Sequence, residues 1–526
     1  MVYSCPFCEL YENFFHQSPY FGITSTMSQR KSKASLLRSV LTVSGFSIVT
    51  RALAFLFKIY LSRTLGAEVM GLYQTAITVF FLFIALSTGG ISTVLSRKIA
   101  EFNAKNEGEK GFSLLSTALL VGLGLSLLST AFAYLMLPRS SFFLTDERAI
   151  PLLKIMLPAL FSTTFYIIIR GWFWGNKRFL DFSLSEMIEE ILRIAFTLLF
   201  LAGIFSGIEG ATGLAFAFTV SDFIVLAIII ATYFFRGGKI SKPRPLGEIV
   251  KPATPLTIMK IFASLTGTVV ALIIPQGLIA GGMSVGEATE SVGRIGAMAN
   301  PLLFAPNALI NSLAVVLIPE MSEANANKDT TKLKEQIAMG LRVSIVISCA
   351  FLVGYVALGK ELTSFLYKDV EAGVYLEKAS IILLLAPINA IASSSMNSIG
   401  MEKENFLSYL VGGSLMLLAS FTLPKRLGID AVIVADVLFL LTSSSINLYF
   451  LSRAVGGGLG VLKTLVWVSV FSIPCIFIGN NLSSLTNGLP TLISIVISGI
   501  ICVLAYLVLS ITFRLIDPKS LLKRKT

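Results

Sequence analysis

The stretch Val94-Leu-Ser-Arg-Lys-Ile-Ala-Glu-Phe-Asn-Ala-Lys-Asn106 recurs later in the chain as Val316-Leu-Ile-Pro-Glu-Met-Ser-Glu-Ala-Asn-Ala-Asn-Lys328. The two copies align without a gap and share, among other positions, Asn103 with Asn325. Each copy follows one long apolar run and precedes another. A membrane protein built from two similar halves usually holds its substrate between them, because rocking one half against the other exposes a central site alternately to each side. The repeat therefore predicts a transporter with two related halves.

The composition indicates that lipid surrounds most of this chain. Apolar residues make up 55% of the 526 residues and charged residues only 14%, and the mean hydropathy is +0.81. Apolar runs of about 20 residues are long enough to span a bilayer as helices, and about 14 such runs occur. We therefore predict an all-α polytopic membrane protein. The runs lie near 38–60, 74–96, 112–137, 151–170, 184–206, 210–235, 254–280, 297–319, 337–359, 379–399, 405–423, 431–452, 461–480 and 490–514.

The repeat and the longest linker together predict the domain organisation. Two parallel six-helix bundles are expected, followed by two additional helices at the C-terminal end. A second pair of matching patterns, Pro158…Gly171…Asn176 and Pro387…Gly400…Asn405, keeps identical spacing and supports the pairing of the halves. The expected parts are a cytoplasmic N-terminal extension 1–37, a first bundle 38–235, a cytoplasmic linker 236–253, a second bundle 254–452, helices 13 and 14 within 453–514, and a basic cytoplasmic tail 515–526.

The distribution of lysine and arginine predicts the orientation in the membrane. Most of the 42 cationic side chains fall on segments that share a side with the N-terminal extension. Because such residues are concentrated in cytoplasmic loops, both termini are expected in the cytoplasm of a multi-pass protein of the cell membrane. This bias explains the net charge of +12, so nucleic-acid binding is not required to account for it.

The sequence contains few residues suited to metal, cofactor or catalytic chemistry. Its one histidine, His16, lies outside the apolar runs, which excludes a histidine-based site within the membrane. Cys5-Pro-Phe-Cys8 is half of a zinc knuckle and has no second ligand pair. The connections between spans are too short for a catalytic domain. We predict no metal, no cofactor and no enzymatic activity.

Three cations lie inside apolar runs, where a charge at mid-bilayer costs about 2.5–3.5 kcal/mol and normally faces a cavity or a partner. Arg51 lies near the middle of the first run, and Lys58 follows seven residues later on the same helix face. Lys260 lies in the seventh run. Arg51 is predicted to face a cavity as part of a binding site. Lys58 and Lys260 either share that role or extend to the membrane interface.

The fifth run carries a charged stripe at i, i+3, i+4 and i+7, and the sixth carries one acid. The residues are Glu186, Glu189, Glu190, Arg193 and Asp222. One interpretation is a structural network in which Arg193 neutralises a neighbouring carboxylate. The other is that one carboxylate binds a coupling proton or sodium ion, since buried carboxylates have movable pKa values. Asp222 has two candidate partners, Arg193 and Arg51.

The eighth run is polar along one side. Asn300, Asn307 and Asn311 lie there beside two prolines. These amides either bind a saccharide by hydrogen bonds or form ordinary interhelical bonds. Proline breaks are tolerated in membrane helices because neighbouring groups satisfy the freed carbonyls.

Four motifs in the right order resemble one protein family. They are Lys58-Ile-Tyr-Leu-Ser-Arg-Thr-Leu-Gly-Ala-Glu-Val-Met-Gly-Leu-Tyr73, Arg170-Gly-Trp-Phe-Trp-Gly175 followed by Glu189-Glu190-Ile-Leu-Arg193, Ile274-Pro-Gln276, and Leu313-Ala-Val-Val-Leu-Ile-Pro-Glu-Met-Ser-Glu323. They resemble the stage V sporulation protein B group of the multidrug/oligosaccharidyl-lipid/polysaccharide flippase superfamily, over roughly residues 36–515. The resemblance implies two bundles facing a central cavity. It also implies transport of polyprenyl-pyrophosphate-linked saccharides such as lipid II.

The resemblance assigns roles to some of these residues. Similar lipid II flippases carry an arginine in a Ser-Arg-x-Leu-Gly-Phe pattern in span one, which here reads Thr50-Arg51-Ala-Leu-Ala-Phe55. They also use a basic residue in span seven, for which Lys260 is the nearest candidate, and a lipid-tail groove at spans 13 and 14. We therefore expect Arg51, Lys58 and Lys260 to bind a pyrophosphate. The expected partners are a lipid-linked saccharide, membrane lipids and a Na⁺ or H⁺ coupling ion, bound by a monomer.

Two other functions fit the sequence less closely. A cation-coupled multidrug exporter of the same superfamily needs acids lining the cavity, whereas the first and seventh runs contribute cations. A membrane glycosyltransferase or polymerase needs a large external loop or catalytic carboxylates near one face, which the short loops do not provide. The sequence does not identify the glycan, the coupling ion or the pathway.

Overall fold

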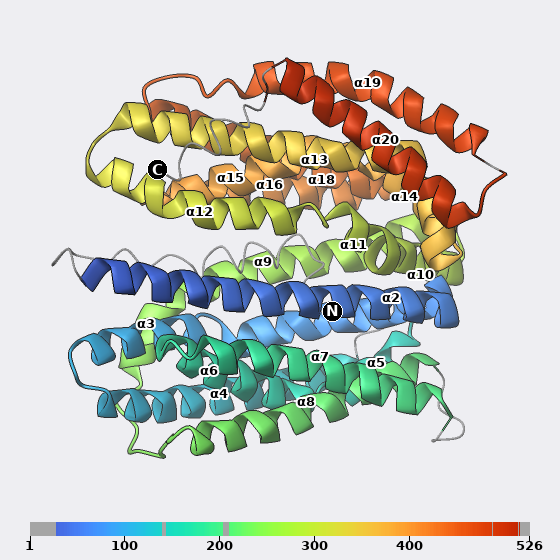
Figure 1. Cartoon of the computed structure of the whole chain (residues 1–526). Helices are drawn as coiled ribbons and strands as arrows, with labels where there is room; N and C mark the ends of the chain where they lie inside the picture. The colour runs from blue at the N-terminus through green and yellow to red at the C-terminus, as the bar shows by residue number, and fades with distance from the viewer. Residues whose placement is uncertain (1–27, 139–143, 204–209, 487, 514, 516–526) are drawn as a thin grey trace. The chain divides into compact units, whose positions relative to one another are not determined.

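The computed structural model describes residues 28–138, 144–203, 210–486, 488–513 and 515. Cys5, Cys8, His16 and nearly all of the predicted basic tail lie outside the described residues. Within the described residues the chain is helical and contains no strand (Figure 1). The prediction of an all-α membrane protein is confirmed.

The helices form two compact units, each described by itself below. The first unit runs to Pro275 and also includes Val285–Gly293, and the second comprises Gln276–Ser284 and the described chain from Arg294 onward. The helices that begin in the first unit are α2 (Ser28–Thr88), α3 (Ile91–Ala104), α4 (Glu109–Met136), α5 (Ala149–Met156), α6 (Ala159–Gly175), α7 (Phe179–Leu201), α8 (Gly210–Phe235), α9 (Gly247–Ala280) and α10 (Val285–Gly293). The predicted boundary at 236–253 differs from this division and stays a prediction.

From Arg294 onward the second unit consists of a π-helix, Arg294–Ala299, followed by ten α-helices. They are α11 (Asn300–Leu303), α12 (Asn307–Ala326), α13 (Thr330–Tyr367), α14 (Glu371–Ala379), α15 (Ile382–Ser398), α16 (Glu402–Thr422), α17 (Pro424–Leu427), α18 (Asp430–Ala454), α19 (Val461–Leu485) and α20 (Thr491–Thr512).

Every predicted apolar run coincides with a helix or with a chain of helices, but the count of 14 is not confirmed. In the described part of the chain, nine helices are long and apolar enough to cross a membrane, or up to 11 if each of two bent pairs is one span. Two predicted runs fall within the single long helix α2 and the start of α3. Gly66 separates them, because its φ of 79° and ψ of 172° interrupt the helix.

The two bent helix pairs show that the matching Pro158 and Pro387 patterns do not mark equivalent positions in the two halves. Helices α5 and α6 meet at 49°, and α14 and α15 meet at 55°. Pro158 lies at the first bend, between α5 and α6, whereas Pro387 lies inside α15. The equal spacing of the Pro158 and Pro387 patterns therefore pairs residues that occupy different places in the fold.

The repeat around Val94 and Val316 marks equivalent places in the two units. Leu95 and Leu317 match in the repeat, and both are fully buried. The last residues of the two copies, Asn106 and Lys328, both adopt positive φ, 58° and 55°, where each chain leaves its helix. The repeat therefore marks the C-terminal end of a helix in each unit, α3 in the first and α12 in the second.

The asparagine that the two copies share donates a hydrogen bond, in each unit, to a residue just after the end of another helix. Asn103 Nδ2 donates to Asn176 Oδ1 at 3.0 Å, immediately after α6. Asn325 Nδ2 donates to the Ile399 carbonyl at 3.4 Å, immediately after α15. The acceptor is a side-chain amide in the first unit and a backbone carbonyl at a helix end in the second, and an asparagine can donate to either.

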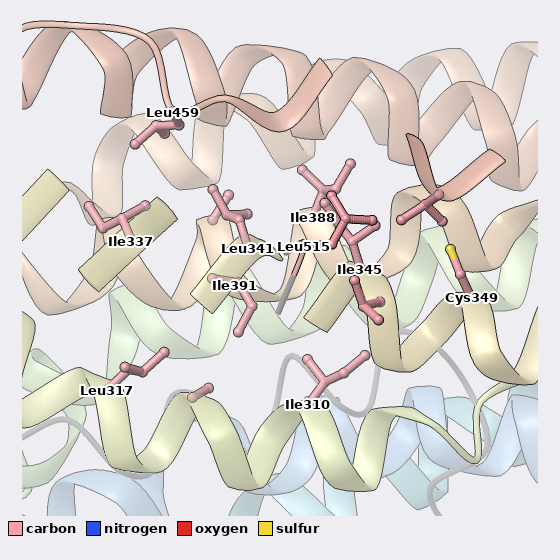
Figure 2. Packing of buried hydrophobic residues seen from close by; sticks show 14 of the residues in the cluster. Ile310, Leu317, Ile337, Leu341, Ile345, Cys349, Ile388, Ile391, Leu459 and Leu515 are labelled. Carbon is pink, nitrogen blue, oxygen red and sulfur yellow. The ribbon is translucent and has the colours of Figure 1, made fainter. Parts of the chain in front are cut away.

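Buried apolar side chains fill the second unit around α13. Ile337, Leu341, Ile345 and Cys349 follow one face of α13 and pack against residues of α12, α15, α18, α19 and α20 (Figure 2). Lipid is as apolar as leucine, so the close packing of these side chains, rather than their removal from water, stabilises the unit.

The predicted linker between the bundles is bound to the first unit along its length. Tyr233 Oη donates to the Lys239 carbonyl at 2.7 Å. The Arg244 N–H donates to Thr117 Oγ1 at 2.7 Å, and the Thr117 hydroxyl donates to the Arg244 carbonyl at 3.1 Å. Arg236 pairs with Asp181 at 2.6 Å. These contacts fix the segment against α4, α7 and α8.

Candidate functional site

The charged stripe predicted in the fifth run lies on α7, and its cation is the centre of a buried network. The Arg193 side chain is 4% exposed. One of its terminal nitrogens, Nη2, lies 2.7 Å from Glu189 Oε1 and 3.2 Å from Asp222 Oδ1. Nη1 lies 3.6 Å from Glu190 Oε2. One guanidinium therefore contacts three carboxylates from two helices.

Asp222 enters this network from α8, which packs against α7. Its second oxygen, Oδ2, accepts a hydrogen bond of 2.5 Å from Thr163 Oγ1 on α6. The ring of Phe218, one turn before Asp222, lies 4.9 Å from the Arg193 guanidinium and adds a cation–π contact. Of the two partners considered for Asp222, the structure shows Arg193.

Glu186 belongs to a separate pair, although it lies on the same stripe. Its Oε2 accepts a hydrogen bond of 2.9 Å from Arg170 on α6. The Arg170 guanidinium also lies 3.9 Å from the centre of the Phe182 ring. Arg170 was not predicted as a partner of Glu186. The sequence did contain a signal for this pair. Arg170 and Glu186 lie the same number of residues before and after Arg178, in the turn between two antiparallel helices, so the two helices bring them side by side.

Two of the predicted head-group cations lie on α2. Arg51 is half-buried, and its Nε donates to Ser47 Oγ one turn earlier at 3.3 Å. Lys58 is buried, with 6% of its surface exposed. The long aliphatic stem of Lys58 accounts for part of this burial among the apolar neighbours of the helix.

The third predicted cation, Lys260, is held by the first unit. Its Nζ donates a hydrogen bond of 2.9 Å to the carbonyl of Gly89, at the break between α2 and α3. Lys260 was predicted to lie in the first helix of the second bundle. By its contacts it belongs to the same compact unit as Arg51 and Lys58.

The three asparagines of the eighth run lie in the second unit, around the break between α11 and α12. Asn307 is buried as the first residue of α12, while Asn300 and Asn311 are half-buried. The break follows from Pro306, whose missing N–H ends the regular hydrogen bonding. The Leu302 carbonyl accepts from the Ala305 N–H at 3.0 Å and from Tyr355 Oη on α13 at 2.7 Å.

A buried polar cluster in the second unit was not predicted. Asn447 on α18 donates to Ser393 Oγ on α15 at 3.2 Å and to Asn405 Oδ1 on α16 at 3.3 Å. Asn405 in turn donates to Asn397 Oδ1 at 2.9 Å. Small polar residues recurring within apolar runs were the available signal. All groups in the cluster are neutral, and they join three helices by interhelical hydrogen bonds.

The described residues provide no arrangement for a metal ion. No group of three or more His, Cys, Asp or Glu side chains suited to a metal occurs among them. The described cysteines, Cys349, Cys475 and Cys502, are buried as free thiols in the second unit.

Comparison with known proteins gives the chain a family. The model of the polysaccharide biosynthesis protein family matches residues 36–325. Stage V sporulation protein B of Bacillus subtilis (strain 168) is 24% identical over 421 residues, which cover 77% of this chain and 81% of that protein. Lipid II flippase MurJ of the same strain is 22% identical over 460 residues, covering 80% of this chain and 84% of that protein.

Solved structures share the fold. A lipid II flippase MurJ in an inward closed conformation superposes with a TM-score of 0.63 at 17% identity, covering 90% of this chain and 98% of that chain. An inward-facing multidrug resistance transporter of the MATE family, from the same superfamily, gives a TM-score of 0.64 at 17% identity, covering 81% of this chain and 99% of that chain. These similarities support the predicted polytopic helical architecture.

Proposed function

The chain belongs to the polysaccharide biosynthesis protein family, and we propose on that premise that it transports a polyprenyl-pyrophosphate-linked saccharide across the cell membrane. The substrate class is a lipid II-like molecule or a polysaccharide repeat unit. The protein acts by alternating access as a transporter and performs no covalent chemistry on its substrate. Both termini lie in the cytoplasm, and the protein acts as a monomer.

Arg51 is the observation that carries this proposal. It keeps a permanent charge on a predominantly apolar helix, and its side chain is only half-buried. A guanidinium at such a depth normally faces a cavity or an anionic partner. Its planar fork of N–H donors matches a phosphate group, which explains an arginine at this position.

Lys58 and Lys260 supply further positive charge from the same unit. In the proposed mechanism these cations attract the pyrophosphate, the saccharide crosses through the polar interior, and the polyprenyl tail stays in lipid beside α19 and α20. Asn300, Asn307 and Asn311 offer amide groups to the saccharide. An inside-negative potential favours outward movement of an anion by about 2.3 kcal/mol per charge per 100 mV.

The test is translocation of a lipid-linked pyrophosphate saccharide by the purified protein in vesicles. Arg51→Ala is expected to reduce translocation by about tenfold or more, the loss equivalent to one hydrogen bond to a charged group. Arg51→Lys retains part of the activity, and Arg97→Ala, on the exposed surface of α3, serves as the matched control. Full activity of Arg51→Ala would overturn the proposed role of the cation.

A cation-coupled multidrug exporter is the second candidate, and the buried carboxylates around Arg193 favour it. In this alternative Glu189, Glu190 or Asp222 binds a coupling proton or Na⁺ and the cargo is a cationic drug. Efflux of a fluorescent organic cation from vesicles separates the two functions. Efflux that requires Asp222 and proceeds without any lipid-linked saccharide transport would favour the exporter.

A further inference from the structure

Span two is broken at Gly89 and Gly90, and α9 packs against the break. The Gly90 N–H donates to Thr257 Oγ1 on α9 at 2.8 Å. One turn further along α9, Lys260 Nζ donates to the Gly89 carbonyl at 2.9 Å. Two side chains three residues apart on α9 therefore bind the N–H and the C=O of one peptide group, the one that joins Gly89 to Gly90 between α2 and α3.

This packing requires glycine at both positions of the break. Gly89 has a φ of 39°, and a Cβ added to it would lie 2.3 Å from Thr257 Oγ1. A Cβ added to Gly90 would lie 2.7 Å from Leu256 Cβ. Since contacts this short do not occur in real structures, any side chain at these positions would force α9 away from the break.

The Thr257 hydroxyl is oriented by a second hydrogen bond. It donates to the Ala253 carbonyl of its own helix at 2.8 Å. The hydroxyl proton is therefore used within α9, and an oxygen lone pair is directed to the Gly90 N–H. Serine preserves both bonds, whereas valine removes both and keeps the shape of the side chain.

The contact with Gly89 fixes the position of the Lys260 ammonium without cancelling its charge. A peptide carbonyl is neutral, and the carbonyls at the end of a helix carry the partial negative charge that attracts a cation. A lysine held in this way has already lost part of its rotamer freedom before a ligand binds, which reduces the entropy cost of binding.

We propose that Gly89, Gly90 and Thr257 are positioning residues that hold Lys260 for the pyrophosphate head group of the substrate. This inference rests on the proposed function and extends it by naming residues that act through Lys260. The break, Thr257 and Lys260 belong to the same compact unit as Arg51 and Lys58.

The test is a double-mutant cycle on the full-length protein in detergent, with farnesyl pyrophosphate as the probe and its dissociation constant as the readout. Lys260→Ala is expected to weaken binding by about tenfold. Thr257→Val is expected to weaken it several-fold, and the double variant no further than Lys260→Ala alone, because the two residues act as one group. Thr257→Ser retains binding. Thr254→Val is the matched control, since the hydroxyl of Thr254 donates within α9, to the Val250 carbonyl at 2.8 Å.

Each outcome decides the proposal. If Lys260→Ala weakens binding and Thr257→Val does not, the positioning role is wrong while the head-group role of Lys260 stands. If the effects of Thr257→Val and Lys260→Ala simply add, Thr257 acts independently of Lys260 and the proposal fails. If Lys260→Ala leaves binding unchanged, both the positioning role and the proposed head-group contact are overturned. Thr257→Val adds no bulk, so the test does not depend on the folding of glycine variants.

Discussion

The guanidinium of Arg193 on α7 donates a hydrogen bond of 3.2 Å to the carboxylate of Asp222 on α8. Both side chains are nearly inaccessible to solvent, and the same guanidinium binds Glu189 at 2.7 Å. In an apolar environment a charge is tolerated only when it is paired and hydrogen-bonded. The pair therefore ties α7 and α8 together, whatever additional role the carboxylates have in transport.

Arg193→Leu is expected to destabilise the protein strongly, because it leaves buried carboxylates without their cation. Breaking a buried ion pair on one side costs about 3–5 kcal/mol. Thermal unfolding in detergent measures the loss. Arg97→Leu is the matched control, since Arg97 lies 3.9 Å from Glu101 in an exposed pair, for which about 0–1 kcal/mol is expected. Equal losses of stability in the two variants would show that the buried Arg193 network stabilises the protein no more than an exposed ion pair does.

Gly293→Ala is expected to disrupt the packing of α10 against α2. A Cβ at Gly293 would lie 1.8 Å from the Ala67 carbonyl oxygen, so the two helices would have to separate. The expected result is a lower unfolding temperature. Gly124→Ala in α4 is the control, because nothing lies within 4 Å of its added Cβ, and about 0.5–1 kcal/mol of stabilisation is expected there. A Gly293→Ala variant as stable as the wild type would contradict this close helix contact.

The contact between Asp146 and α10 is expected to contribute less to the stability of the protein in acid. Its carboxylate accepts hydrogen bonds from Arg148 Nε at 3.0 Å and from Thr289 Oγ1 on α10 at 2.9 Å. Burial opposes ionisation, but the bonds from Arg148 and Thr289 outweigh it and hold the pKa of Asp146 below its ordinary value. A lowered pKa in the folded state stabilises the protein at neutral pH, and this contribution is lost as the pH falls through that pKa.

Unfolding temperatures of wild type and Asp146→Asn measure this effect. The difference between them is expected to be largest at neutral pH and to shrink below about pH 4, where the carboxyl of the unfolded chain begins to be protonated while that of the folded protein is still charged. Glu107→Gln is the control, since Glu107 pairs with Lys110 at 2.7 Å on the exposed surface. A difference independent of pH would show that the charge of Asp146 does not stabilise the contact.

The apolar periodicity predicted the helices well, because every span must satisfy its backbone internally and therefore forms a helix. It did not predict the breaks. Gly66 interrupts α2, but many other glycines lie inside continuous helices, so local sequence does not distinguish the two situations. The contacts that α9 makes with the Gly89–Gly90 break decide the placement of that helix, and they join residues far apart in the chain.

The candidate site was predicted in part. The i, i+3, i+4 and i+7 spacing placed Arg193 beside Glu189 correctly, because that pairing depends only on helix geometry. The Arg170–Glu186 pair was missed because it depends on the turn between two helices. The head-group role of Arg51, Lys58 and Lys260 stays a prediction, as does ion binding by the carboxylates.

Tyr355→Phe is expected to destabilise the break between α11 and α12 in span eight. The Tyr355 hydroxyl donates to the Leu302 carbonyl, which also accepts from the Ala305 N–H. Removing the hydroxyl takes away one of these two hydrogen bonds, at a cost of about 0.5–1.5 kcal/mol. Tyr367→Phe is the matched control on the same helix, because the Tyr367 hydroxyl is buried and makes no hydrogen bond within the described part of the chain. Its removal is expected to be neutral or slightly stabilising. Thermal unfolding of the two variants therefore separates loss of the hydroxyl from loss of its hydrogen bond. A Tyr355→Phe variant as stable as Tyr367→Phe would mean that the bond from Tyr355 adds nothing to the one that the Leu302 carbonyl accepts from Ala305.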